Sequence, residues 1–330
     1  MRAAWAPPPV PELALDLGTG LTRLAQRGGS LLIEQPSTPA APRSRGALAP
    51  EECPERAIVH GVVVDAEAAA HLLAPHLRSI RRASPVRPRV LVCHPSDASP
   101  AERQLLVEAA LLAGAGAVGL VSEPVAAARA LPRAGPASQR PELVVDVGEG
   151  VTDIAVVQAD RLVGSAAFRT GLAELRESLR RAVLEEHDVL LQDAELATLL
   201  ESPARHAGDP DWLGVDRLGG AREQEHGRRV LRRVLLVRAA AVARVLERAL
   251  HAIERAAASL LDSLGRRERA GVLRAGVLFA GGGARIAPLR EGLGQRLGCC
   301  LRLPPRPLHA VVLGARALLE RGPRPDWRRS

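Results

Sequence analysis

The chain of 330 residues contains no Lys, no Asn and no Tyr, and its aromatic residues are two Phe and three Trp. So few aromatic side chains leave little surface on which nucleic-acid bases can stack. The net charge of +8 is carried by Arg spread along the chain, which is typical of GC-rich coding and not of one basic surface. We therefore expect no nucleic-acid partner.

Long apolar runs are also missing, since none approaches the roughly 20 residues that a membrane-spanning helix needs. The Pro-rich start around Trp5 lacks the apolar core of a signal peptide. The four Cys have no metal-ligand spacing and are expected to be reduced. We expect a cytoplasmic protein, with contact at a membrane surface as an open alternative. The Arg-rich region from Val230 to Leu264 has apolar residues at helical spacing, which predicts a long amphipathic helix.

An internal repeat organises the chain. Residues 13–25 and 143–155 share the frame Leu-x-x-Asp-x-Gly-x-Gly-x-Thr-x-x-Ala, which puts Asp16 and Asp146 130 positions apart. Each copy has an apolar strand, a Gly turn and a return strand, the pattern of a β-hairpin. Two copies a domain's length apart indicate a duplicated fold with one hairpin in each half.

The residue types of the repeat suit a phosphate-binding cleft. Gly in a turn lets backbone N–H groups approach a phosphate closely. An Asp before the turn can hold hydrated Mg²⁺, which needs only one or two carboxylates. Two such hairpins on opposite walls would clamp a polyphosphate, with Asp16 and Asp146 holding Mg²⁺ through water. A pair of ordinary hairpins is the alternative.

Between the hairpins, the sequence predicts a strand over Arg89–Cys93 and a helix after the capping box of Ser99 and Glu102. A second strand over 117–121 ends just before Glu123, where another helix begins. This is the ligand-binding edge of an open α/β sheet, where a carboxylate can orient an attacking water for phosphoryl transfer. The alternative, a Glu that only stabilises the helix N-terminus, stays open.

A triple-Gly turn follows the apolar strand from Val277 near the end of the chain. Gly281, Gly282 and Gly283 offer bare backbone against which a flat ligand can lie. Arg285 directly after them can stack its guanidinium on an adenine ring.

Together these motifs resemble the MreB type of bacterial actin homologue over roughly Leu13 to Leu319. The resemblance implies an α/β actin-like ATPase fold, made of duplicated ribonuclease H-like domains around a nucleotide cleft, with ATP and Mg²⁺ as cofactors. It also implies self-association or contact with other actin-like subunits, cell-wall or cell-shape proteins as partners, and filaments under the membrane. The motifs that carry it are Asp16-Leu-Gly-Thr19, Pro95-Ser96 with Glu102-Arg103, Glu123-Pro124-Val-Ala-Ala-Ala128, Asp146-Val-Gly148 and Gly281-Gly-Gly283.

The resemblance assigns roles residue by residue. Glu123 would orient the hydrolytic water, and Glu195 would help to bind the nucleotide. The remaining nucleotide-binding residues would be Asp16, Gly18 and Thr19 in a first phosphate loop, Asp146, Gly148 and Gly150 in a second, and Gly281, Gly282, Gly283 and Arg285 at the adenosine.

The chain departs from the family at three cleft positions: Glu149 stands where members have Gly, Val151 where they have Thr, and Thr198 where they have Lys. Glu149 brings a negative charge beside the phosphates. The segment between Pro36 and Ala57 is shorter than the small subdomain that members carry there.

We expect domain I over 13–143, shortened around 37–57, with a closing helix over 308–319 returning to it, and domain II over 144–307. Residues 1–12 and 320–330 are expected to be tails. The predicted function is an MreB-like, rod shape-determining cytoskeletal protein that binds Mg–ATP, with slow ATP hydrolysis and nucleotide-linked assembly. The alternative is a non-hydrolysing actin-like scaffold that acts through protein–protein contacts.

Overall fold

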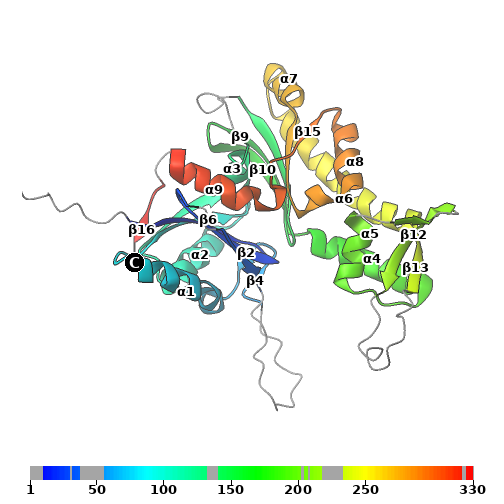
Figure 1. Ribbon diagram of the computed structural model, residues 1–330. Helices are drawn as coiled ribbons and strands as arrows, with labels where there is room; N and C mark the ends of the chain where they lie inside the picture. Colours follow the sequence, from blue (N-terminus) through cyan, green and yellow to red (C-terminus); the bar gives the residue numbers. More distant parts are fainter. Residues whose placement is uncertain are drawn as a thin grey trace, which may run out of the picture.

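The computed structural model describes residues 10–29, 32–37, 56–131, 140–201, 204–206, 209–217, 233–321 and 325–329. Most of the shortened segment between Pro36 and Ala57 lies outside these residues, as do Trp5 and Cys53. Two mixed β-sheets form the body of the described chain (Figure 1).

The first sheet contains the first predicted hairpin. Strand β1 (Glu12–Leu17) pairs antiparallel with β2 (Leu21–Gln26) and parallel with β6 (Arg89–His94). Helix α2 (Pro100–Leu112) begins at the predicted capping box, in which Ser99 and Glu102 exchange both reciprocal hydrogen bonds. Across the sheet the strands run in the order β16 (Arg328–Arg329), β7 (Ala117–Ser122), β6, β1, β2 and β3 (Leu32–Pro36).

The outer face of this sheet is covered by α2 and by α1 (Ala66–Ala83), which bury their leucines against the leucines of β1. A small hairpin of β4 (Ile58–Val59) and β5 (Val62–Val63) precedes α1. The hairpin matters for the cleft because its turn, formed by His60 and Gly61, lies beside both phosphate-loop candidates.

The second sheet contains the second predicted hairpin. Strands β8 (Glu142–Val147) and β9 (Thr152–Gln158) pair antiparallel, and β14 (Val277–Gly281) pairs parallel with β8. The order across the sheet is β10 (Arg161–Phe168), β9, β8, β14 and β15 (Leu301–Arg302). Helices α6 (Ala239–Asp262) and α8 (Ala287–Leu297) cover its outer face, while α4 (Leu172–His187) packs against α6 and α5 (Asp193–Glu201) packs against α4.

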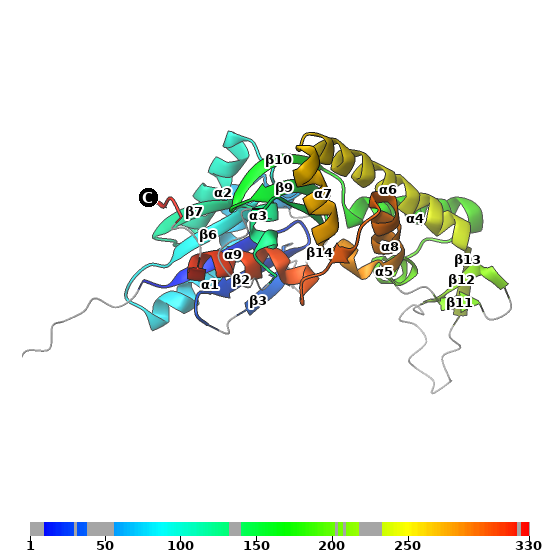
Figure 2. The ribbon, with the colours of Figure 1, turned by 90° about the horizontal axis from the view of Figure 1, so that it is seen from above.

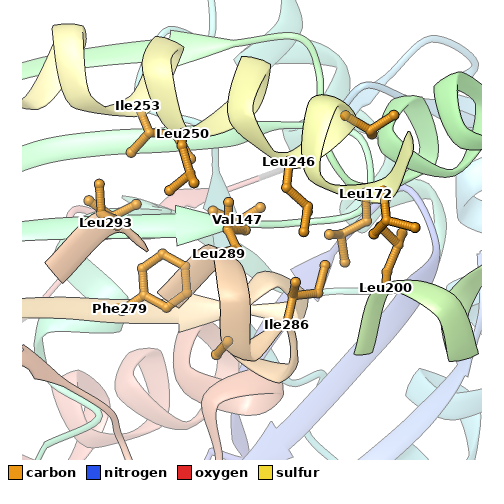
Figure 3. Packing of buried hydrophobic residues seen from close by; sticks show 14 of the residues in the cluster. Val147, Leu172, Leu200, Leu246, Leu250, Ile253, Phe279, Ile286, Leu289 and Leu293 are labelled. Carbon is orange, nitrogen blue, oxygen red and sulfur yellow. The ribbon is translucent and has the colours of Figure 1, made fainter. Parts of the chain in front are cut away.

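Figure 3 shows how this outer layer is packed: Phe279 of β14 lies among leucines that come from α6 and α8. Val147, the last residue of β8, is buried in the same cluster. The end of the second hairpin strand is therefore fixed by the core, which holds the turn that follows in a defined position.

Two helices lie between the sheets, α3 (Glu123–Ala128) and α9 (Ala310–Arg321), which corresponds to the predicted closing helix (Figures 1 and 2). They share one apolar cluster with residues of both sheets, among them Ala14 and Val144. A Cβ at Gly314 of α9 would overlap the carbonyl oxygen of Ala126 in α3, so glycine allows the two backbones to touch. The layers are therefore helix, sheet, helix, sheet and helix.

The predicted helix from Val230 to Leu264 is wrong in its first part. Residues 233–238 form strand β13 (Arg233–Arg238), and the helix α6 begins only at Ala239. The run Val-Leu-Leu-Val at 234–237 suits a strand as well as a helix, and its antiparallel pairing with β12 (Asp209–Arg217) stabilises the strand. With β11 (Ala204–His206) these strands form a further small sheet, and α7 (Arg266–Ala275) follows α6.

Among the helices of the described ranges, none combines the length and apolar character needed to cross a membrane.

Candidate functional site

The two hairpin turns have the same internal geometry. The Gly18 N–H donates to the Leu21 carbonyl at 3.2 Å, and the Gly148 N–H donates to the Val151 carbonyl at 2.9 Å. In each turn a Cβ on the glycine would lie 3.0 Å from the same carbonyl oxygen. The repeat found in the sequence is therefore also a repeat in structure.

The turns line the same cavity, which has a volume of about 250 Å³. Gly150 of the second turn lies directly against the Thr19 side chain of the first, and Gly20 of the first lies against Glu149 of the second. The Thr19 hydroxyl also accepts a hydrogen bond of 2.7 Å from the Gly61 N–H. Two turns from opposite halves of the chain thus meet at one end of the cavity.

Most of the predicted site residues line this cavity. Two do not. Glu195 is buried, and its carboxylate accepts a hydrogen bond of 2.7 Å from the Gln192 N–H at the start of α5. Gly283 is covered by the Val147 side chain. The predicted residues that do line the cavity are Asp16, Gly18, Thr19, Glu123, Asp146, Gly148, Gly150, Gly281, Gly282 and Arg285.

Three buried carboxylates stand at the base of the cavity, each at the end of a central strand or the start of α3. Burial raises the pKa of Asp146 to about 7, with the charges of Asp16 and Asp153 adding to the rise. Burial likewise raises the pKa of Asp16, whereas the positive charge of Arg23 lowers it. Burial raises the pKa of Glu123 well above its usual value, and the negative charges of Asp16, Asp146 and Asp153 raise it further. Carboxylates that raise each other's pKa in this way are suited to share a bound cation.

The donor set fits Mg²⁺. Within the described residues no three or more His, Cys, Asp or Glu side chains are arranged to hold a metal ion. Mg²⁺ does not need such a cluster, because it keeps several waters and takes one or two carboxylates. Asp16 and Asp146, on strands from different sheets, supply that number.

Gly281 is required by the carboxylate next to it. Its φ of 78° lies in the left-handed region, and a Cβ there would overlap Oδ1 of Asp146 and the Val147 carbonyl. The triple-Gly turn therefore brings bare backbone close to the Asp146 carboxylate, and Gly281 and Gly282 line the cavity.

Sequence reasoning missed two arginines that line the cavity. Arg23 of β2 is mostly buried and its guanidinium lies 3.4 Å from Asp16 and 2.7 Å from Glu34. Arg176 of α4 is paired with Glu149. A signal for Arg23 was present, because it occupies the position of the repeat at which the second copy has Asp153. Arg176 had no such signal.

Sequence reasoning also missed the contacts that join the two sheets beside the cavity. The Asp153 carboxylate accepts two hydrogen bonds of 2.6 Å from Ser96, one from its N–H and one from its hydroxyl. Burial raises the pKa of Asp153 to about 6, which the bonds from Ser96 oppose. Arg169, at the end of β10, lies 2.9 Å from Asp97 and donates to the His60 carbonyl at 3.0 Å. These bonds hold the two halves of the chain together next to the turns.

A model of the MreB/Mbl protein family matches residues 54–324 of this sequence. The chain is 24% identical to the cell shape-determining protein Mbl of Bacillus subtilis (strain 168) over 331 residues, which cover 94% of this chain and 96% of that protein. It is 26% identical to the cell shape-determining protein MreB of Escherichia coli (strain K12) over 335 residues, which cover 94% and 93% of the two chains.

Solved structures with the same fold include MreB5 of Spiroplasma citri bound to ADP, with a TM-score of 0.73, 20% identity and coverage of 94% of this chain and 96% of that one. The MamK double helical filament matches with a TM-score of 0.71, 22% identity and coverage of 96% and 100%. At these identities the likeness shows the fold, and the actin-like α/β fold predicted from the sequence is confirmed.

Proposed function

The chain belongs to the MreB/Mbl family of actin-like, cell shape-determining cytoskeletal proteins, and from this premise we propose that it binds Mg–ATP in the cavity between its paired hairpin turns. The observation that carries the proposal is the pairing itself: two equivalent Gly turns beside two buried carboxylates, Asp16 and Asp146. Backbone N–H groups of such turns bind phosphate oxygens. The bound ADP of MreB5 supports a nucleotide in this fold.

The residues divide between three tasks. Asp16 and Asp146 would hold Mg²⁺ through water, and the cation would supply charge neutralisation at the phosphates. Gly281, Gly282 and Arg285 would bind the adenosine. Glu123 orients the hydrolytic water, since it is buried at the cavity next to both metal-side carboxylates.

Assembly is the second part of the proposal. The MamK double helical filament, which has the same fold, supports self-association of this chain. We place the chain in the cytoplasm, with peripheral contact at the membrane and with cell-shape or cell-wall proteins as partners. Residues 13–143 together with α9 act as one domain and residues 144–307 as the other, with the nucleotide cleft between them.

The alternative function is a scaffold of the same family that does not hydrolyse ATP. The observation that favours it is the ion pair of Glu149 and Arg176 inside the cavity, because it holds a carboxylate beside the second Gly turn, where a phosphate would bind.

Equilibrium titration of the purified monomer with ATP, with and without Mg²⁺, tests the first proposal. We expect Mg-dependent binding in the wild type, loss of the Mg-dependence in Asp16→Asn and Asp146→Asn, and no change in Glu108→Gln, an exposed carboxylate on α2. Absence of binding at millimolar ATP and at millimolar ADP would overturn nucleotide binding and leave the scaffold.

Phosphate release tests the role of Glu123. The Glu123→Ala variant should bind ATP as the wild type does and release phosphate at least about tenfold more slowly, because a lost water-positioning group costs rate and not affinity. Unchanged phosphate release would show that Glu123 has no part in the reaction.

A further inference from the structure

Glu149 fills the gap between the two Gly turns. It occupies the turn position equivalent to Thr19 of the first copy, 130 positions earlier. Its side chain extends over the opposite turn, so that a Cβ on Gly20 would lie 3.0 Å from Glu149 Cγ and 3.6 Å from Cδ. The carboxylate therefore lies at the place where two turns of this kind would clamp the outermost phosphate of a ligand.

The side chain is held there from two directions. The N–H of Ala173 at the start of α4 donates to the Glu149 carbonyl at 2.9 Å, which fixes the backbone of the turn. Arg176, one helical turn later, donates to Oε1 of Glu149. The Arg176 and Glu149 side chains are 17% and 31% exposed, so the pair is partly removed from water. Glu149 is thus part of the wall of the cavity and not a surface residue that happens to point inward.

The charges that line the cavity determine whether a terminal phosphate can bind beside Glu149. Among the residues that the structure describes, each arginine lining the cavity is already paired with a carboxylate: Arg23 with Asp16, Arg176 with Glu149, and Arg285 with Glu201 at 2.5 Å. A terminal phosphate placed between the turns would therefore meet the Glu149 carboxylate, and each of these three arginines already has a carboxylate partner. Two like charges at about 4 Å repel each other even in water, and more strongly where water is partly excluded.

We propose that Glu149, held by Arg176, takes the place of the terminal phosphate and makes the cleft select nucleoside diphosphates over triphosphates. The inference rests on the proposed nucleotide site and names the form of nucleotide that this site prefers. A diphosphate ends one group short of the gap and keeps its contacts with the rest of the cavity, whereas a triphosphate must displace Glu149 from Arg176 or lie against it.

The test compares the dissociation constants of Mg–ADP and Mg–ATP for the wild-type protein and for Glu149→Gln and Glu149→Gly. Glu149→Gln removes the charge and keeps the size of the side chain, whereas Glu149→Gly also empties the gap. Glu185→Gln, an exposed carboxylate on the same helix as Arg176, is the matched control. Thermal unfolding shows that each variant is folded before it is titrated.

We expect the wild type to bind ADP at least about tenfold more tightly than ATP. In Glu149→Gly the affinity for ATP should rise by at least about tenfold while that for ADP changes by less than about threefold, with Glu149→Gln in between. Equal affinities of the wild type for ADP and ATP, or a ratio that neither variant changes, would overturn the inference and leave the nucleotide site standing. Failure of every variant to bind either nucleotide would overturn the nucleotide site as well.

Discussion

Removal of the Asp146 charge should stabilise the protein in the absence of Mg²⁺. The carboxyl group is 5% exposed, and burial, with the charges of Asp16 and Asp153, raises its pKa to about 7 from 3.8. A group whose pKa is higher in the folded than in the unfolded state contributes stability below its unfolded pKa, and that stability is lost as the pH rises through the folded pKa. Asp146 therefore weakens the fold progressively between about pH 4 and pH 7.

The size of the effect follows from the two pKa values. The difference between about 7 and 3.8 corresponds to about 4 kcal/mol once both states are ionised. At pH 5 the unfolded chain is already ionised while the folded one is not, so about 2 kcal/mol of this has been lost. Relative to the wild type, Asp146→Asn should therefore gain about 2 kcal/mol at pH 5 and about 4 kcal/mol at pH 8.

Urea unfolding at pH 5, 6, 7 and 8 in the presence of EDTA measures these free energies. Asp326→Asn, which removes an exposed carboxylate far from the cavity, is the control and should follow the wild type at every pH. If Asp146→Asn is less stable than the wild type at pH 8, or if the gain does not grow with pH, burial of the Asp146 charge does not destabilise the fold.

Two further substitutions test the contacts around the cavity. Gly150→Ala drives a Cβ into the Thr19 side chain, and urea unfolding should show a loss of about 1–3 kcal/mol, as is usual for overpacking. Arg169→Ala removes the bonds to Asp97 and to the His60 carbonyl. Because the Arg169 side chain is 30% exposed, we expect a loss of only about 1 kcal/mol, smaller at high salt.

Matched controls separate these contacts from general effects of the substitutions. A Cβ at Gly271 of α7 meets nothing within 4 Å, so Gly271→Ala should stabilise the helix by up to about 1 kcal/mol. Arg181→Ala removes a helix-surface ion pair with Glu177 whose arginine is 72% exposed, and it should change stability by less than about 0.5 kcal/mol. Equal losses in a test variant and its control would contradict the assigned contact.

Parts of the fold follow from short stretches of sequence because their causes are local. The capping box of Ser99 and Glu102 starts α2 with hydrogen bonds between residues three apart. Each hairpin depends on a Gly turn between apolar strands, and the shared frame around Asp16 and Asp146 strengthens a signal that one copy alone leaves weak. Glu123 lies in the cavity, as predicted, because strand β7 ends directly before it.

Other features depend on partners far away in the chain. Residues 233–238 form a strand because β12 lies beside them, a pairing that no local pattern reveals. Glu195 turns its carboxylate to the Gln192 N–H, and a sequence does not distinguish a carboxylate that caps its own helix from one that faces a ligand. Arg176 reaches a residue 27 positions away in the second hairpin turn, and Arg169 reaches a residue 72 positions away that follows a strand of the other sheet, so the contacts of both appear only in the folded chain.

The two copies of the hairpin share their glycines and their first aspartate but differ in charge at two other positions of the frame. Thr19 of the first copy corresponds to Glu149 of the second, and Arg23 corresponds to Asp153. The shared residues fix the geometry of the turns, since each turn glycine makes the same hydrogen bond. The unshared residues differ in how their charge is compensated: Arg23 compensates Asp16, whereas Glu149 has Arg176 as its own counter-charge. In the proposed nucleotide site, a duplicated frame would keep its shape while one turn position changes the number of phosphates that it receives.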